Sequence, residues 1–154
     1  MSETISMSTQ TILNRWSVHR DVLFELVKVF PESSANFRPT PKVMSVVEMI
    51  HHLAWVPDFF FSAMEGREWK VPPVPQTLAE ARELLEELTI EHRAVISRFT
   101  EEDLQREATI HVFNKTEPIA EMLQRMITHE AHHKGQLILY ARLLELEPPF
   151  YTIY

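Results

Sequence analysis

The sequence contains no cysteine and only two glycines among its 154 residues. Without cysteine there are no disulfides, thiolate metal sites or cysteine nucleophiles, so a transition-metal site must be built from histidine, aspartate and glutamate. No apolar run approaches the roughly 20 residues that a membrane-spanning helix needs. The segment 1–10 is polar and lacks the pattern of a signal peptide. We therefore expect a cytoplasmic protein that has no membrane partner.

Basic residues are also scarce. The net charge is -7, and lysines and arginines form no basic stripe. Because a nucleic-acid-binding surface would be basic, we expect no nucleic-acid partner. Hydrophobic residues make up 45% of the chain and charged residues 24%, which is ordinary for a globular protein. The length predicts a single domain over residues 1–154.

Prolines separate segments whose apolar residues recur with helical spacing. Helices are expected at about 8–30, 45–64, 77–99 and 118–147. Pro57 lies inside the second segment and predicts a kinked helix, with two shorter helices as the alternative. Residues 100–117 are expected to form a long crossover, with a short extended piece near 107–113. This pattern predicts an all-α four-helix bundle with a long crossover between the third and fourth helices.

The fourth helix carries two histidines that suggest a metal site. His129 and His133 are four residues apart, so their Cβ atoms lie roughly 5–6 Å apart on one helix face. The second helix offers His51 and His52 within an apolar stretch, and only one of two adjacent histidines is expected to face the same site. We predict His52, His129 and His133 as metal ligands. His51 and His132 are the alternatives.

A site with three histidine ligands leaves coordination positions open. Such a site favours zinc, or an octahedral nickel, manganese or iron ion. Its chemistry would be Lewis acidity, which lowers the pKa of a bound water or thiol or polarises a carbonyl. Glu48 lies four residues before His52 and is a candidate partner for that ligand, or a fourth ligand.

Two other interpretations of the histidines compete with this one. A histidine on a helix is often structural, and His19, His92 and His111 have no neighbours that suggest a ligand role. The residues from His129 to His133 also match the His-Glu-x-x-His pattern of zinc metalloproteases, in which the glutamate is the general base. A further ligand would have to come from downstream, but Glu145 is about 18 Å away along the helix. We therefore disfavour a protease.

Two stretches resemble the DinB family: SVVEMIHHLAW at 45–55 and HEAHHKGQ at 129–136. The spacing between them and the turn at 100–104 also resemble the family. The likeness covers about residues 8–147. The resemblance implies a four-helix bundle, a divalent metal held by the same three histidines, and frequent homodimers. Some relatives are transferases or isomerases that depend on a low-molecular-weight thiol. Others are known only as metal-binding proteins associated with stress or damage.

Two functions therefore remain open. The first is a metal-dependent transferase or hydrolase that activates a low-molecular-weight thiol or water to attack a small electrophile. The second is a non-catalytic, metal-binding stress- or damage-response protein. A basic group near the metal that could bind an anionic substrate would favour the enzyme. Lys134 and Arg142 lie on the appropriate helix for that role.

Overall fold

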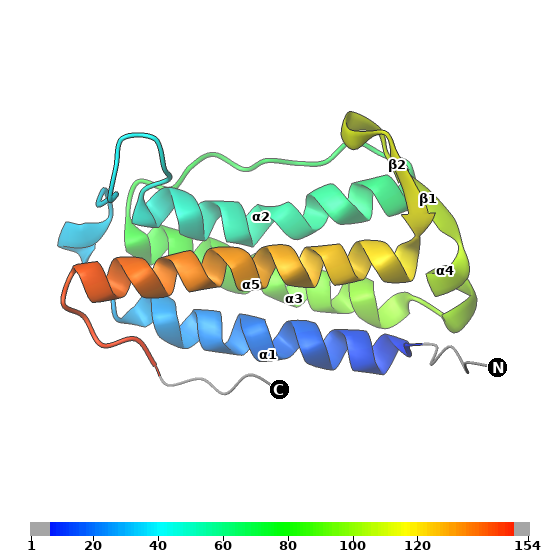
Figure 1. Ribbon diagram of the computed structural model, residues 1–154, viewed down its shortest axis with the longest axis horizontal. Helices are drawn as coiled ribbons and strands as arrows, with labels where there is room; N and C mark the ends of the chain where they lie inside the picture. Colours follow the sequence, from blue (N-terminus) through cyan, green and yellow to red (C-terminus); the bar gives the residue numbers. More distant parts are fainter. Residues whose placement is uncertain (1–6, 150–154) are drawn as a thin grey trace.

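The computed structural model describes residues 7–149, in which four long helices lie side by side (Figure 1). These helices are α1 (Thr9–Lys28), α2 (Val46–Glu65), α3 (Leu78–Arg98) and α5 (Ile119–Leu143). The shorter elements are η1 (Glu32–Ser34), α4 (Glu101–Gln105), β1 (Glu107–Ile110), η2 (His111–Phe113) and β2 (Lys115–Pro118). The predicted four-helix bundle is confirmed. Within the described range, every helix is too short or too polar to cross a membrane.

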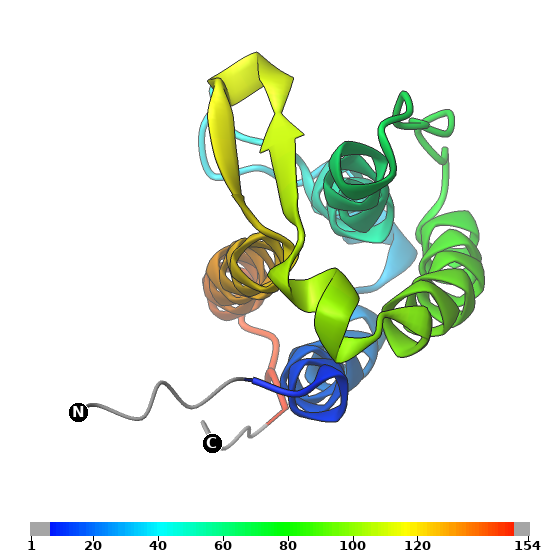
Figure 2. The ribbon, with the colours of Figure 1, turned by 90° about the vertical axis from the view of Figure 1, so that its right-hand side faces the viewer.

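The four long helices follow one another around the bundle in the order α1, α5, α2, α3 (Figure 2). Helices α2 and α3 run in the same direction, and α1 and α5 run in the opposite one (Figure 1). The segment 66–77 must therefore return along the length of the bundle before α3 begins. In this arrangement α2 has α5 on one side and α3 on the other.

The long connection between α3 and α5 stays at one end of the bundle (Figure 1). It forms α4 and then an antiparallel hairpin in which Glu107 of β1 pairs with Pro118 of β2. The predicted extended piece is therefore present, as the first strand of this hairpin. Ala108 and Ile110 alternate with more exposed neighbours and join the core, which holds the hairpin against the helices.

Helix α2 continues through Pro57, so the alternative of two shorter helices is wrong. Proline has no N–H, and the carbonyl of Leu53 therefore loses its helical partner. The guanidinium of Arg20 on α1 replaces that partner, because its Nη2 donates to the Leu53 carbonyl at 3.0 Å. A buried cation from a neighbouring helix thus satisfies the backbone group that Pro57 leaves open.

Arg20 is fully buried and also contacts the other two long helices. It donates to Thr89 of α3 at 3.2 Å and to the carboxylate of Glu130 on α5 at 2.7 Å. Trp16, one turn before Arg20, donates to the same Glu130 oxygen at 3.2 Å. This polar layer lies between two apolar clusters that fill the two halves of the bundle.

We expect Arg20→Met to lower the free energy of unfolding by about 3 kcal/mol or more, because it leaves the Glu130 carboxylate buried without its cation. Urea denaturation measures this loss. The double variant Arg20→Met/Glu130→Leu should recover part of it, since no uncompensated charge remains. Arg93→Met is the matched control. It removes an ion pair with Asp21 that also joins α1 to α3 but is exposed, and should cost less than about 1 kcal/mol. Equal losses in the two single variants would contradict this prediction.

Candidate metal centre

The structure brings together the three histidines that the sequence predicts as ligands. His52 projects from α2, and His129 and His133 project from α5, so that one potential ligand atom of each lies within 4.8 Å of the others. The Nε2 atoms of His52 and His129 are 3.0 Å apart. All three side chains are half-buried. Among the described residues, no carboxylate belongs to this group.

The donor set suits a divalent transition metal. Zinc binds imidazole nitrogen at about 2.0–2.1 Å, so two ligand nitrogens of a tetrahedral site lie about 3.3 Å apart. The 3.0 Å between the Nε2 atoms of His52 and His129 is close to this spacing, and a ligand nitrogen of His133 lies within 4.8 Å of both residues' ligand atoms. Three protein ligands also leave room for a further ligand from solution.

The electrostatics of the triad keep its imidazoles neutral, which is the state that binds metals. Burial, with the neighbouring His133 and His51, lowers the pKa of His52 to about 4. Burial, with His133, His52 and His132, lowers the pKa of His129 to about 3. Burial also lowers the pKa of His133. Protons therefore compete poorly for these nitrogens at neutral pH.

Gln136 orients one of the three histidines, a role that the sequence analysis missed. The Nδ1–H of His133 donates to Oε1 of Gln136 at 2.7 Å, and this leaves the Nε2 lone pair of His133 for a metal. The amide nitrogen of Gln136 in turn donates to Nε2 of His132 at 3.3 Å. A partner three residues further along a helix is readable from spacing, so this signal was available.

The prediction that Glu48 supports His52 is wrong. One oxygen of Glu48 accepts the backbone N–H of Ser45 at 2.9 Å and completes the capping box of α2. The other accepts from Arg38 at 2.9 Å. Both oxygens therefore serve the start of the helix rather than the triad.

The two alternative ligands lie outside the triad. His51 faces away from α5, and its Nε2 lies 2.7 Å from the carbonyl oxygen of Pro72 in the segment that joins α2 to α3. His132 is exposed and stacks on His133 with ring centroids 4.7 Å apart. The geometry thus favours the predicted set over both alternatives.

Glu130 cannot act as the general base of a metalloprotease in this arrangement. Its carboxylate is buried in the polar layer and accepts from Arg20 and Trp16. Lys134 is also buried and lies 2.9 Å from His19 on α1, which directs it away from the triad. Arg142 is exposed near the far end of α5. Neither basic residue singled out in the sequence therefore lies at the triad.

A cavity of about 510 Å³ opens beside the triad, and His129 forms part of its wall. Phe60, Ile110 and Phe113 give it an apolar side. Arg125, one turn before His129, supplies a guanidinium and is paired with the carboxylate of Glu117, with one N–O distance of 3.0 Å. The hairpin thus closes one side of the space next to the metal centre.

The bundle and its converging histidines together define a helical-bundle protein with a candidate metal centre. A family model described as the DinB superfamily matches residues 15–137. This range covers most of the chain, and the chain belongs to that superfamily.

One protein is similar to this chain in both sequence and structure. The uncharacterized protein YjoA of Bacillus subtilis is 28% identical over 146 residues, covering 91% of this chain and 94% of YjoA. The crystal structure of YjoA, a DinB-like protein, superposes with a TM-score of 0.76, at 25% identity over 93% of this chain and 99% of YjoA.

Two more distant structures share the fold. One is YfiT from Bacillus subtilis, which is described as a probable metal-dependent hydrolase with an unusual four-helix bundle topology. Its TM-score is 0.72 at 15% identity, and the match covers 96% of this chain and 95% of the YfiT chain. A mycothiol-dependent maleylpyruvate isomerase has a TM-score of 0.62 at 16% identity, over 89% of this chain and 63% of the isomerase.

The depressed pKa values predict how the metal-free protein responds to acid. The folded pKa values of His52 and His129 lie near 4 and 3, below the ordinary value of 6.5. At a pH between the folded pKa values and 6.5, these two histidines bind more protons in the unfolded chain than in the folded protein. The free energy of unfolding should therefore fall as the pH decreases from 7 to 4. Urea denaturation of metal-stripped protein at pH 7 and pH 5 measures this fall. The variant His52→Gln/His129→Gln should show a shallower fall, and an equally steep one would contradict the assignment.

Proposed function

We propose that this protein is a metal-dependent enzyme that binds one divalent metal ion through His52, His129 and His133. The reaction would be attack by a low-molecular-weight thiol or water on a small electrophile. The observation that carries the proposal is the convergence of three neutral, half-buried imidazoles, one of which, His129, lines a cavity large enough for a small molecule. Zinc and nickel suit this donor set best.

A bound metal would supply Lewis acidity, which lowers the pKa of a thiol or water or polarises a carbonyl. The chain supplies the rest. Gln136 holds the ring of His133 in one orientation. Phe60 and Phe113 give the cavity an apolar wall against which a substrate could pack. Arg125, fixed by Glu117, gives that cavity a positioned hydrogen-bond donor.

The relatives support this class of reaction. YfiT is described as a probable metal-dependent hydrolase, and the isomerase depends on the thiol mycothiol. Water and a thiol are the two nucleophiles that the open site could accept. His132 is exposed and stacks on His133, which places a further imidazole beside the triad. The homodimer and the cytoplasmic location remain predictions.

Metal content of protein purified without a histidine tag tests the site. Elemental analysis should find about one divalent ion per chain in the wild type, and little in His52→Ala or His133→Ala. The matched controls, His51→Ala and His132→Ala, remove neighbouring imidazoles that lie outside the triad and should retain the metal. A folded wild-type protein that takes up neither zinc, nickel nor manganese would contradict the proposal.

Gln136→Leu should weaken metal affinity by about 10- to 100-fold, because the His133 ring loses the partner that fixes its orientation. Competition with a chromogenic chelator measures the affinity. Gln124→Leu is the control on the same helix, since Gln124 lies in the cavity wall and contacts no ligand of the triad. Equal affinities of wild type and Gln136→Leu would remove Gln136 from the site.

Activity separates the enzyme from a protein that only binds metal. The metal-loaded wild type should accelerate the reaction of a small electrophile with low-molecular-weight thiols or water, and His129→Ala should abolish the acceleration. Stoichiometric metal without turnover across a panel of thiols and electrophiles, and without any change of a cobalt-substituted spectrum on thiol addition, would favour the non-catalytic alternative.

A further inference from the structure

A second cavity lies on the other side of α2, between α2, α3 and the segment 66–77. We call it the α2–α3 pocket. Its volume is about 530 Å³, which lies within the usual range for small-molecule sites. It shares no lining residue with the cavity beside His129. The metal centre therefore does not account for it.

The walls of the α2–α3 pocket are mainly apolar and aromatic. Trp55 and Phe61 of α2 form one side, and Leu88 and Val95 of α3 form the other. The edge-to-face contact of Trp55 with His52, at 5.6 Å between ring centroids, places the indole between the pocket and the triad. Flat aromatic and aliphatic walls of this kind suit a planar ring.

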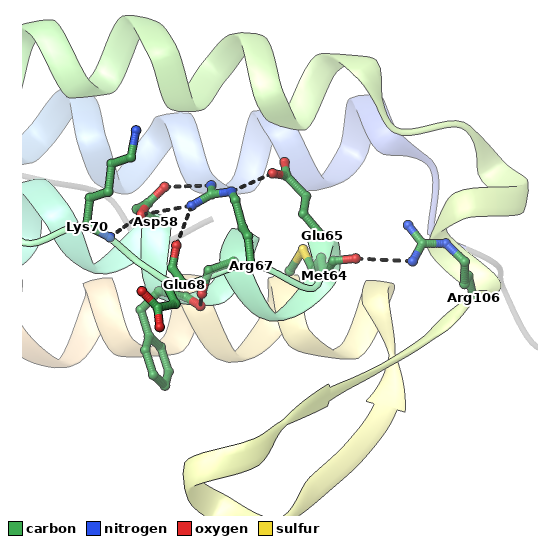
Figure 3. A network of polar contacts seen from close by, with 9 residues as sticks. Asp58, Met64, Glu65, Arg67, Glu68, Lys70 and Arg106 are labelled. Atoms are coloured by element: carbon green, nitrogen blue, oxygen red, sulfur yellow. Dashed lines mark hydrogen bonds and ion pairs between the residues drawn. The ribbon is translucent and has the colours of Figure 1, made fainter.

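The lining of the pocket includes Asp58, Arg67 and Lys70, which belong to a network of polar contacts (Figure 3). Arg67 donates to both oxygens of Asp58, at 2.7 and 3.2 Å, and Asp58 also accepts the backbone N–H of Lys70 at 2.7 Å (Figure 3). Glu91 and the side chain of Lys70 complete the charged lining. Two acidic and two basic side chains balance one another, so an ionic ligand would find no net opposite charge.

His92 is the polar group that points to a ligand. It is 3% exposed, lines the pocket and packs against Phe61 with ring centroids 5.4 Å apart. No hydrogen bond joins its imidazole to a residue within 7–149, and its Nδ1 has no accessible surface, which leaves Nε2 as the ring nitrogen that can face the pocket. Burial and the nearby Arg20 lower the pKa of His92 to about 4, so the ring is neutral and offers one donor and one acceptor. Polar groups in a largely buried position are normally satisfied, so Nε2 of His92, which has no partner among the described residues, is the natural anchor for a polar atom of a ligand.

We propose that the α2–α3 pocket binds an uncharged aromatic small molecule with one hydrogen-bonding group, of the size of indole or a phenol. Its ring packs against Trp55 and Phe61, and its polar group bonds to His92. The site is separate from the metal centre and does not depend on turnover there.

Isothermal titration with indole, on both metal-free and metal-loaded full-length protein, tests the proposal. We expect saturable binding of one indole per chain with a Kd below about 1 mM, which a ligand of this size can reach. Indene has the same shape without the N–H and should bind about tenfold more weakly, because it leaves His92 unpaired. Indole-2-carboxylate should also bind more weakly than indole. Absence of saturation with indole, or tighter binding of indene or of the carboxylate, would overturn the proposal.

Two variants locate the site. Leu88→Trp fills the pocket and should weaken indole binding at least tenfold. Ile90→Trp adds the same ring to an exposed position of α3 and should leave binding unchanged. His92→Phe preserves the ring contact with Phe61 and should abolish the difference between indole and indene. Unchanged binding by Leu88→Trp would place the ligand elsewhere and overturn the proposal, whether or not His92→Phe folds.

Discussion

The buried guanidinium of Arg20 is the interaction on which the arrangement of the bundle depends. From α1 it reaches the Leu53 carbonyl on α2, the Thr89 hydroxyl on α3 and the Glu130 carboxylate on α5. Leu53 follows His52, and Glu130 follows His129. The contacts that fix the rotation of α2 and α5 about their axes are therefore made beside the residues that converge at the metal centre. Consecutive residues on a helix point about 100° apart, so one can face the interior polar layer while its neighbour faces the triad.

This arrangement costs stability as well as providing it. Desolvating a guanidinium and a carboxylate is expensive, and their attraction offsets that cost only when hydrogen bonds satisfy the remaining polar atoms. Arg20 Nε and Glu130 Oε1 have no hydrogen-bond partner in the described part of the chain. An apolar layer of similar volume would fill the core equally well, but it would leave the Leu53 carbonyl, which Pro57 cannot bond, without a hydrogen-bond donor. Pro57 and Arg20 therefore act together: the proline frees the Leu53 carbonyl, and the arginine that bonds it fixes the register of α2 against α1 and α5.

Local patterns predicted most of this fold, and long-range contacts account for what they missed. Helical spacing and capping residues located the four long helices, and the separation of His129 and His133 located the triad. Glu48 illustrates a local conflict: the same carboxylate could cap α2 or approach His52, and the backbone N–H three residues away is the nearer partner. The pairing of Arg20 with Glu130 joins residues 110 positions apart and has no periodic signature. The hairpin was predicted only in part because strands of four residues give little alternation to detect.

Helix α2 shows how one turn can divide its side chains among several tasks. His52 faces α5 and the triad, while His51 contacts the Pro72 carbonyl and ties down the segment 66–77. Trp55 lies between them in space and contacts both imidazoles. A rotation of α2 by a single residue would exchange His51 for His52, remove the segment from its anchor and withdraw the Leu53 carbonyl from Arg20. One orientation of this helix therefore suits three features at once: the metal centre, the segment 66–77 that His51 anchors, and the polar layer around Arg20. That agreement explains why two adjacent histidines of identical chemistry have different partners.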